Sequence, residues 1–350
     1  MRRVLPAIGL YFLTPLVAEF LFGNIAITSL FSILAFLSAS LLYGGGALLI
    51  REGVRRAGSG WPTIFAFALA YGVLEEGVAT QSLFDPHYLG RYHLLTYGSI
   101  PALGISPPWT LFVLGLHMIW SISVPIALVE SLAGSRRTTP WLGKIGLSVA
   151  ATLYALGLLK GLFGSIYIDH FVASAPQFVG TGIAAIVIVG IGILLGRREA
   201  PSRNQTTGKA PSPWLVGVVS LVAGSLFLLI YAADPTGLSP WLASIHLTPW
   251  LATVLYLLLY VGLAALVSYW SHLSGWSDAH RLALAGGALL AYAWHSFPWE
   301  PFLSVSPMLD LVSKTILAVG AVSLLVIAAL RLKKEERTAR IDHDARSVPV

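Results

Sequence analysis

The chain has 350 residues, of which 56% are hydrophobic and only 11% charged, and its mean hydropathy is +0.77. Since a soluble domain carries about a quarter charged residues, a soluble globular fold is excluded. The absence of cysteine excludes disulfides, thiolate metal sites and cysteine nucleophiles. The net charge of +6 follows from the placement of basic loops and gives no reason to expect nucleic acid as a partner.

Apolar runs close to the length of about 20 residues that spans a bilayer as a helix follow one another along the chain. Backbone polar groups in lipid must be satisfied within each segment, and no short segments of alternating polarity indicate a membrane β-barrel. We therefore predict an all-α, polytopic transmembrane helical bundle in the lipid bilayer. Its ten spans are expected at residues 4–22, 25–50, 62–83, 107–132, 145–165, 176–196, 213–233, 247–271, 281–298 and 310–331.

The loops between these spans indicate the orientation and the domains. With a cytoplasmic N-terminus, 19 of the 22 basic residues lie in inner segments and only Arg91 lies in an outer loop, as the positive-inside rule requires. We predict a cell-membrane protein with both termini cytoplasmic. Residues 1–196 form a six-span bundle and residues 213–331 a four-span bundle packed on it. The linker 197–212 should be flexible, and the basic tail 332–350 disordered.

Two adjacent glutamates, Glu75 and Glu76, lie inside the third predicted span. Ionisable groups in a membrane segment are costly unless they are paired or protonated, so a chain carries two of them mainly where they have a function. Because neighbouring like charges disfavour full ionisation, the pair should hold about one shared proton. Thr80 lies one turn after Glu76, and Gln81 follows it; both are expected to support the pair.

Two histidines lie at a similar depth in later spans. With a rise of about 1.5 Å per residue in a core about 30 Å thick, Glu75, His117 and His295 all fall in the outer half of the membrane. Ser121 lies one turn from His117, and Tyr292 flanks His295. Facing each other is the cheapest way for these groups to avoid lipid, so we expect them to form one polar pocket.

Other ionisable residues at this depth have a simpler explanation. Glu19, Lys160 and Lys314 are expected to extend toward the outer interface, and His87 and His93 to lie on the surface of the outer loop 84–106. A loop of this length between spans is typical of a lid or a re-entrant element.

A carboxylate pair beside a neutral histidine can activate water, with one glutamate as base and a histidine steadying the oxyanion. The sequence resembles the CPBP family of glutamic intramembrane endopeptidases, related to the CAAX-prenyl proteases, whose members carry EExxxR, FxxxH and HxxxN/D motifs on successive helices. In this resemblance, Glu75 and Glu76 match the double glutamate, His117 the second motif and His295 the third. It implies that these four residues are catalytic, without cofactor or metal, and that the partner is a membrane-embedded peptide or protein substrate.

The sequence also departs from these motifs. Thr80 stands where the family has arginine, Val113 where it has phenylalanine and Trp299 where it has Asn or Asp. The resemblance covers three short patches between about residues 70 and 300. It therefore implies a distant relative in which activity could be changed.

Three other interpretations use the same residues. Buried Glu and His sets also serve proton- or ion-coupled transporters, and a non-enzymatic membrane scaffold is another alternative. A third option is a divalent metal held by Glu75, Glu76 and His117 together with Asp85, His87 and His93 of the outer loop, although no HExxH spacing occurs.

Overall fold

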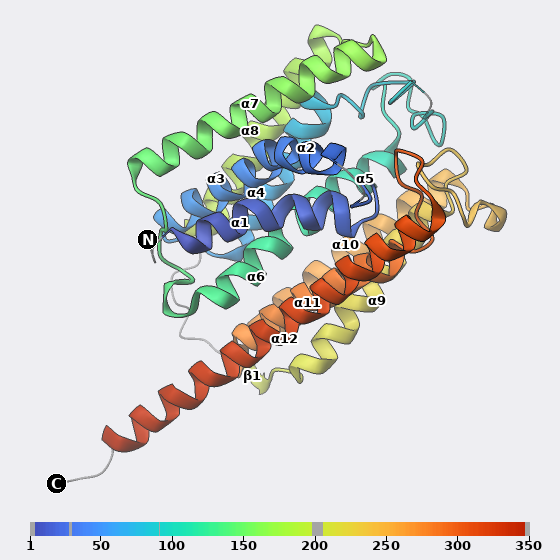
Figure 1. Cartoon of the computed structure of the whole chain (residues 1–350). Helices are drawn as coiled ribbons and strands as arrows, with labels where there is room; N and C mark the ends of the chain where they lie inside the picture. Colours follow the sequence, from blue (N-terminus) through green and yellow to red (C-terminus); the bar gives the residue numbers. More distant parts are fainter. Residues whose placement is uncertain (1–3, 28–29, 91, 198–205, 347–350) are drawn as a thin grey trace.

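The computed structural model describes residues 4–27, 30–90, 92–197 and 206–346, and each of the ten expected spans is helical in it (Figure 1). In chain order the helical segments of the first six spans are α1 (Leu5–Pro15), η1 (Leu16–Leu21), α2 (Leu30–Ala39), η2 (Ser40–Gly44), α3 (Gly45–Arg56), α4 (Trp61–Leu74), η3 (Glu75–Ala79), α5 (Pro107–Leu116), η4 (His117–Ser123), α6 (Val124–Ala133), α7 (Lys144–Asp169) and α8 (Ala175–Arg197). The last four spans are α9 (Pro213–Ala232), α10 (Pro249–Ser271), α11 (Asp278–His295) and α12 (Pro307–Arg346), and two 3-10 turns are η5 (Gly134–Arg136) and η6 (Ala243–Ile245).

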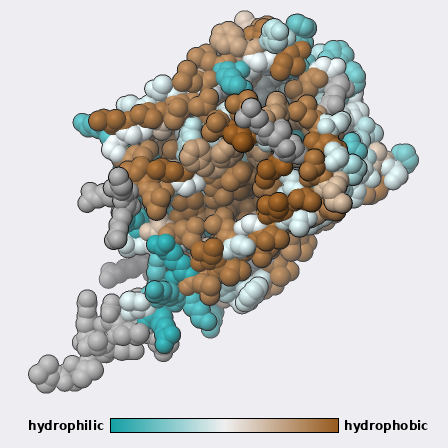
Figure 2. All heavy atoms as spheres, in the orientation of Figure 1, coloured by the Kyte–Doolittle hydropathy of each residue, from teal (hydrophilic) through white to brown (hydrophobic). Residues whose placement is uncertain are grey.

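The chain is an all-α multi-pass membrane bundle, as the sequence predicts. Eight helices of the described residues are long and apolar enough to cross a membrane, and Leu5–Leu21 is a shorter apolar helix. The remaining predicted span coincides with α11 (Asp278–His295), which is not among these eight. Hydrophobic side chains cover most of the face shown in Figure 2. Hydrophilic ones gather toward the lower left of that view, where α12 leaves the bundle (Figures 1 and 2).

Several helices begin in the same way. The side chains of Ser106, Ser212 and Thr248 each accept a hydrogen bond from the backbone N–H three residues later. A proline follows each of them at the first helical position, where its missing N–H costs nothing and its fixed φ favours the helix. The Ser-Pro and Thr-Pro pairs therefore fix the starts of α5, α9 and α10.

Four segments of the first four spans are π-helical. These are η1, η2, η3 and η4, and they continue from α1, α2, α4 and α5 respectively. A π-helical turn is rare, and it often accompanies a functional site, because the wider turn changes the direction in which its side chains point. Here η4 packs on η1 and on α4, and η3 continues α4. No local sequence pattern predicts that η1 and η4, from the first and fourth spans, pack against each other.

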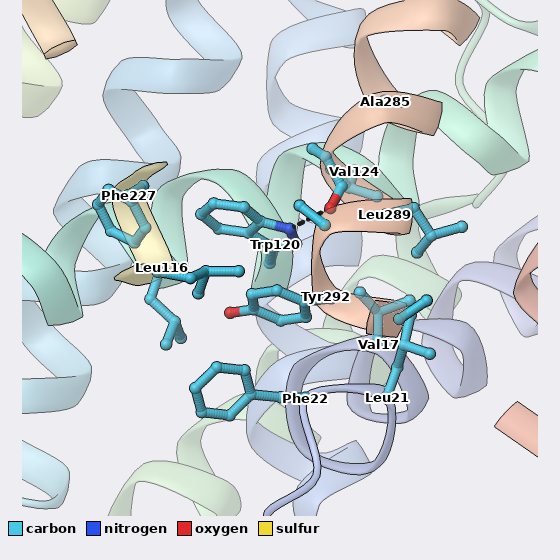
Figure 3. Close-up of a cluster of buried hydrophobic side chains, with 14 of the residues drawn as sticks. Val17, Leu21, Phe22, Leu116, Trp120, Val124, Phe227, Ala285, Leu289 and Tyr292 are labelled. Atoms are coloured by element: carbon cyan, nitrogen blue, oxygen red, sulfur yellow. Dashed lines mark hydrogen bonds between the residues drawn. The ribbon is translucent and has the colours of Figure 1, made fainter. Parts of the chain in front are cut away.

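Small residues bring the second half of the bundle together. Gly287 of α11 lies against the backbone of α9 at Gly217, and a Cβ on Gly224 would be 3.0 Å from the Cβ of Ala291. Such small faces let two helices approach closely in a membrane. The aromatic core then links this pair to the first half: Trp120 of η4 stacks on Tyr292 of α11 at 4.6 Å and donates a hydrogen bond to the carbonyl of Ala288 (Figure 3).

A buried ionic group, which we call the inner network, lies where α3 and α6 end and α7 begins. Arg51 contacts Glu52 at 2.7 Å and Glu130 at 3.1 Å, and Arg55 contacts Glu130 at 2.7 Å. The guanidinium of Arg51 also lies 3.4 Å from the ring centroid of Trp141, whose backbone N–H donates to Glu52. Each carboxylate oxygen here accepts a hydrogen bond, so the network joins α3, α6 and the loop before α7.

The structure differs from two expectations about the linker and the tail. Part of the linker is ordered: strand β1 (Thr206–Lys209) pairs in parallel with β2 (Leu273–Ser274), although residues 198–205 lie outside the described part of the chain. The tail is helical through Arg346, where we expected disorder from residue 332. Ion pairs explain why the helix continues, because Glu335 accepts from Arg137 at 2.5 Å and lies 3.6 Å from Arg331.

Candidate functional site

Glu75, Glu76 and His117 meet in the interior of the first bundle. The Nε2 atom of His117 lies 2.5 Å from Oε2 of Glu75 and 2.6 Å from Oε1 of Glu76, although 41 residues separate Glu76 from His117. All three residues are at most 5% exposed. The glutamates begin η3 and the histidine begins η4, so two π-helical turns direct these side chains toward a common point.

Glu76 is held by several donors. One oxygen of Glu76 lies against His117, and the other accepts hydrogen bonds from the hydroxyls of Thr80, at 2.9 Å, and Ser82. The indole N–H of Trp109 donates to Ser82 at 3.2 Å, which orients that hydroxyl. The other ring nitrogen of His117 lies 3.1 Å from Oγ of Ser121. Thr80 and Ser121 therefore lie where the sequence places them, in direct contact with the glutamate and the histidine.

Glu75 has fewer partners. Its Oε2 atom is close to His117 but forms no hydrogen bond of acceptable geometry with any described residue, and its Oε1 atom lies 3.4 Å from the hydroxyl of Tyr43. The same hydroxyl donates to Glu19 at 2.5 Å, and Asn24 donates to the other oxygen of Glu19 at 2.9 Å. Glu19 is thus part of the cluster, and the expectation that it extends toward the interface is wrong.

Sequence reasoning missed Tyr43, which joins two carboxylates from different helices. Its ring also stacks on that of His117 at 5.9 Å and 19°. The available signal was the run Gly44–Gly46 directly after it, because glycines in a span let neighbouring helices approach closely. A Cβ on Gly45 would lie 2.9 Å from the backbone nitrogen of Tyr154, and one on Gly46 would lie 2.5 Å from the Tyr71 ring.

His295 and Tyr292 lie outside this cluster. His295 is fully buried, but it packs among Phe22, Trp241, Trp294 and Trp299, with its ring stacked on Phe22 at 5.6 Å. Neither ring nitrogen has a hydrogen-bond partner among the described residues. The depth of His295 was therefore no guide to its position in the plane of the membrane, because α11 packs on α9 and turns this side chain into an aromatic enclosure.

Gln81 also stands apart from the glutamates. It is fully buried with φ of 57°, and its side-chain oxygen accepts a hydrogen bond of 2.6 Å from the backbone N–H of Ala173. Gln81 therefore fastens the end of the third span to the connection between α7 and α8. This hydrogen bond gives Gln81 a structural role that involves neither Glu75 nor Glu76.

The remaining ionisable residues divide into three groups. Lys160 is exposed on α7, as expected. Lys314 is buried and not extended toward the interface: it donates to the carbonyl of Trp299 at 2.6 Å and pairs with Asp310 at 2.5 Å. His87 and His93 lie near the surface of the outer loop, with their Nδ1 atoms 3.2 Å apart.

The loop 84–106 packs against the bundle near the cluster through Tyr88. Tyr88, between the third and fourth spans, packs against the aromatic core of the bundle. Burial raises the pKa of Tyr88, and the negative charges of Glu76, Glu75 and Glu19 raise it further. Since a charge effect of this kind requires proximity, the Tyr88 side chain lies on the side of the bundle where these three glutamates are buried.

The geometry also tests whether the three side chains fit a metal ion. One ligand atom from each of Glu75, Glu76 and His117 lies within 4.8 Å of the others. Two ligands of a tetrahedral Zn²⁺ ion with bonds of 2.0–2.1 Å would be about 3.3 Å apart, whereas the nitrogen-to-oxygen separations here are 2.5 and 2.6 Å. These separations are closer to the distance of about 2.7–2.9 Å in a hydrogen bond between charged groups than to the spacing of two ligands. The cluster therefore fits a shared proton better than a ligand sphere.

The family model of an uncharacterized membrane protein family matches residues 10–335, and the chain belongs to that family. No curated protein and no solved structure matches the chain.

Proposed function

We propose that this member of an uncharacterized membrane protein family is a membrane-embedded hydrolase, which activates water at Glu75, Glu76 and His117 to cleave a peptide bond. One observation carries the proposal: two buried carboxylates converge on one imidazole nitrogen, and no lysine or arginine pairs with them among the described residues. Uncompensated charge in a membrane is costly, so a protein retains such charged groups mainly where they have a function.

The unequal partners of the two glutamates indicate different roles. Glu76 accepts from Thr80, Ser82 and His117, so its lone pairs are occupied and it orients the imidazole. Glu75 is less fully hydrogen-bonded: its Oε2 atom lies 2.5 Å from Nε2 of His117 without a hydrogen bond of acceptable geometry, and its Oε1 atom lies 3.4 Å from the Tyr43 hydroxyl. We therefore assign Glu75 as the base that takes a proton from water, and Glu76 and His117 as the groups that hold Glu75 in place.

The resemblance to the CPBP endopeptidases implies the same reaction for three of the four matched residues. Glu75, Glu76 and His117 lie together as that mechanism requires, whereas His295 lies elsewhere. An oxyanion donor at this site must therefore come from another residue.

The surroundings of the cluster support hydrolysis over transport across the membrane. On the side of the cluster that faces the inner network, the interior is filled by buried apolar side chains, among them Ala47, Ile64, Ile122 and Ile126. Eight residues separate Tyr43 from Arg51 in one continuous helix, a distance of about 12 Å at 1.5 Å per residue. A transmembrane proton path requires a continuous series of polar groups. The polar groups of the cluster are therefore not joined to the inner network in the way that such a path requires.

Cleavage by the purified protein tests the proposal. Fluorophore- and quencher-labelled model peptides that span the bilayer should be cleaved in proteoliposomes, and Glu75→Gln, Glu76→Gln and His117→Ala should each lower the rate by at least about 10³-fold. Thermal unfolding should show that each variant is folded, and a divalent-metal chelator should have no effect. His295→Ala, if it folds, should retain activity.

Proton-coupled transport is the second candidate, and one observation favours it. Tyr43 connects Glu75 to Glu19, and Asn24 continues from Glu19, so acidic groups extend in a row toward the end of the first span. Proton flux into proteoliposomes that is lost in Glu76→Gln, together with uncleaved model peptides, would replace hydrolysis by transport.

A further inference from the structure

Tyr71 lies beside the catalytic cluster but has no part in the reaction as described so far. It precedes Glu75 by four residues, and residues at this spacing share one face of a helix. Its ring meets that of His117 edge-on, with centroids 6.0 Å apart and an angle of 63°. Tyr71 is only 3% exposed, and Gly46 leaves room for its ring.

The hydroxyl of Tyr71 has no hydrogen-bond partner among the described residues. The other hydroxyls at the cluster are occupied: Tyr43 donates to Glu19, and Thr80 and Ser82 both donate to Glu76. A buried polar group without a partner lowers stability, and such a group beside a catalytic site is explained if a ligand completes it. Tyr71 is thus the free donor at the cluster.

We infer that Tyr71 is a catalytic residue that donates a hydrogen bond to the carbonyl oxygen of the scissile peptide bond. This inference rests on the proposed hydrolysis and assigns to Tyr71 the oxyanion-stabilising role that was expected of a histidine. His295 is held among Phe22 and three tryptophans, whereas Tyr71 contacts His117 directly.

The reaction then balances with residues of this chain and one water molecule. Water attacks the carbonyl carbon while its proton passes to the carboxylate of Glu75. The carbonyl π-electron pair moves onto oxygen, where the O–H group of Tyr71 stabilises the negative charge. When the tetrahedral intermediate collapses, the carbon–nitrogen bond breaks and the departing nitrogen receives the proton from Glu75. The products are a carboxylic acid and an amine, and Tyr71 never gives up its proton.

Tyr71→Phe removes the hydroxyl alone and tests this role, with Tyr154→Phe as the matched control. Tyr154 is a neighbouring tyrosine, with its ring 6.0 Å from that of Tyr71. With the labelled membrane-spanning peptides as substrate, Tyr71→Phe should lower kcat by about 10²- to 10³-fold with little change in KM, and Tyr154→Phe should leave both unchanged. A peptidyl difluoroketone, whose hydrate resembles the tetrahedral intermediate, should bind Tyr71→Phe more weakly by a similar factor.

The outcomes separate this inference from the proposed function. If Glu76→Gln is inactive while Tyr71→Phe retains full kcat and binds the difluoroketone normally, hydrolysis stands and the role of Tyr71 is overturned. A purely structural role predicts a lower unfolding temperature with kcat unchanged, and that result overturns it as well. If the unmodified protein cleaves none of the peptides, the proposed function fails, and the inference about Tyr71 fails with it.

Discussion

Two regions of the first bundle bury glutamates, and they treat the charge in opposite ways. In the inner network, Glu52 and Glu130 are paired with arginines, and each carboxylate oxygen accepts a hydrogen bond. In the cluster of Glu75, Glu76 and His117, which we call the outer cluster, the two glutamates share a single histidine. One oxygen of Glu75 forms no hydrogen bond of acceptable geometry with the described residues. Burial is similar in both, so it does not distinguish them.

The difference indicates what each region is for. A buried carboxylate whose hydrogen-bond partners are all provided by the protein stabilises one arrangement of helices. It has little hydrogen-bonding capacity left for a ligand. A carboxylate with fewer hydrogen bonds is costly in the same surroundings, and a ligand or a reaction can supply the missing ones. The backbone follows this division: η3 and η4 carry the outer cluster, whereas α3 and α6 carry the regular helical turns of the inner network.

The largest change in stability is expected in the inner network. Glu130→Ala leaves Arg51 and Arg55 buried without their shared carboxylate, and losing one partner of a buried ion pair costs about 3–5 kcal/mol. Denaturation in detergent micelles should show this loss. Glu335→Ala is the control, because its pairs are partly exposed and should contribute about 0–1 kcal/mol. Equal effects of the two variants would remove the basis for treating the inner network as structural.

A smaller effect is expected where the helices approach each other most closely. In Gly46→Ala the new Cβ would lie 2.5 Å from the Tyr71 ring, and such overpacking costs about 1–3 kcal/mol. Because the ring must move, peptide cleavage should fall as well. Gly53→Ala, in the same helix, is the control: no atom lies within 4 Å of its new Cβ, and alanine should stabilise that helix by up to about 1 kcal/mol. Unchanged cleavage in Gly46→Ala would show that the ring position is not critical.

Glu76→Gln is expected to change stability least among the buried glutamates. The amide keeps the shape of the side chain and removes a charge that no arginine balances in the described structure, so the free energy of unfolding should change by no more than about 1 kcal/mol. Activity should nevertheless be lost, as proposed above. A destabilisation as large as that of Glu130→Ala would mean that the outer cluster is structural too.

The orientation can be tested without disturbing either region. Because the chain contains no cysteine, Ser99→Cys and Ser202→Cys each introduce a single thiol. The positive-inside rule places residue 99 outside and residue 202 inside. An impermeant thiol reagent applied to intact cells should therefore label only the first variant. Labelling of the second alone would reverse the orientation and place the Glu75 cluster in the inner half of the membrane.

Particular residues show how far the sequence could predict the site. Glu75, Glu76, His117, Thr80 and Ser121 were found because ionisable residues in spans are rare and because their neighbours follow from helical spacing. Tyr43 and Glu19 were missed since their importance depends on a hydrogen bond between helices. His295 was wrongly placed in the pocket with Glu75 and His117. Equal depth along a helix axis does not determine toward which neighbouring helix a side chain points.

The sequence by itself determined the membrane class, the ten spans and the presence of a costly polar group in the third span, since each follows from apolar length and from the price of charge in lipid. Only the tertiary structure decided which polar groups meet. That depends on rotations of whole helices, set by close contacts at glycines such as Gly46 and Gly287 and by the π-helical turns η1–η4. A π-helical turn rotates every side chain that follows it, and its position depends on packing between helices rather than on any local sequence signal.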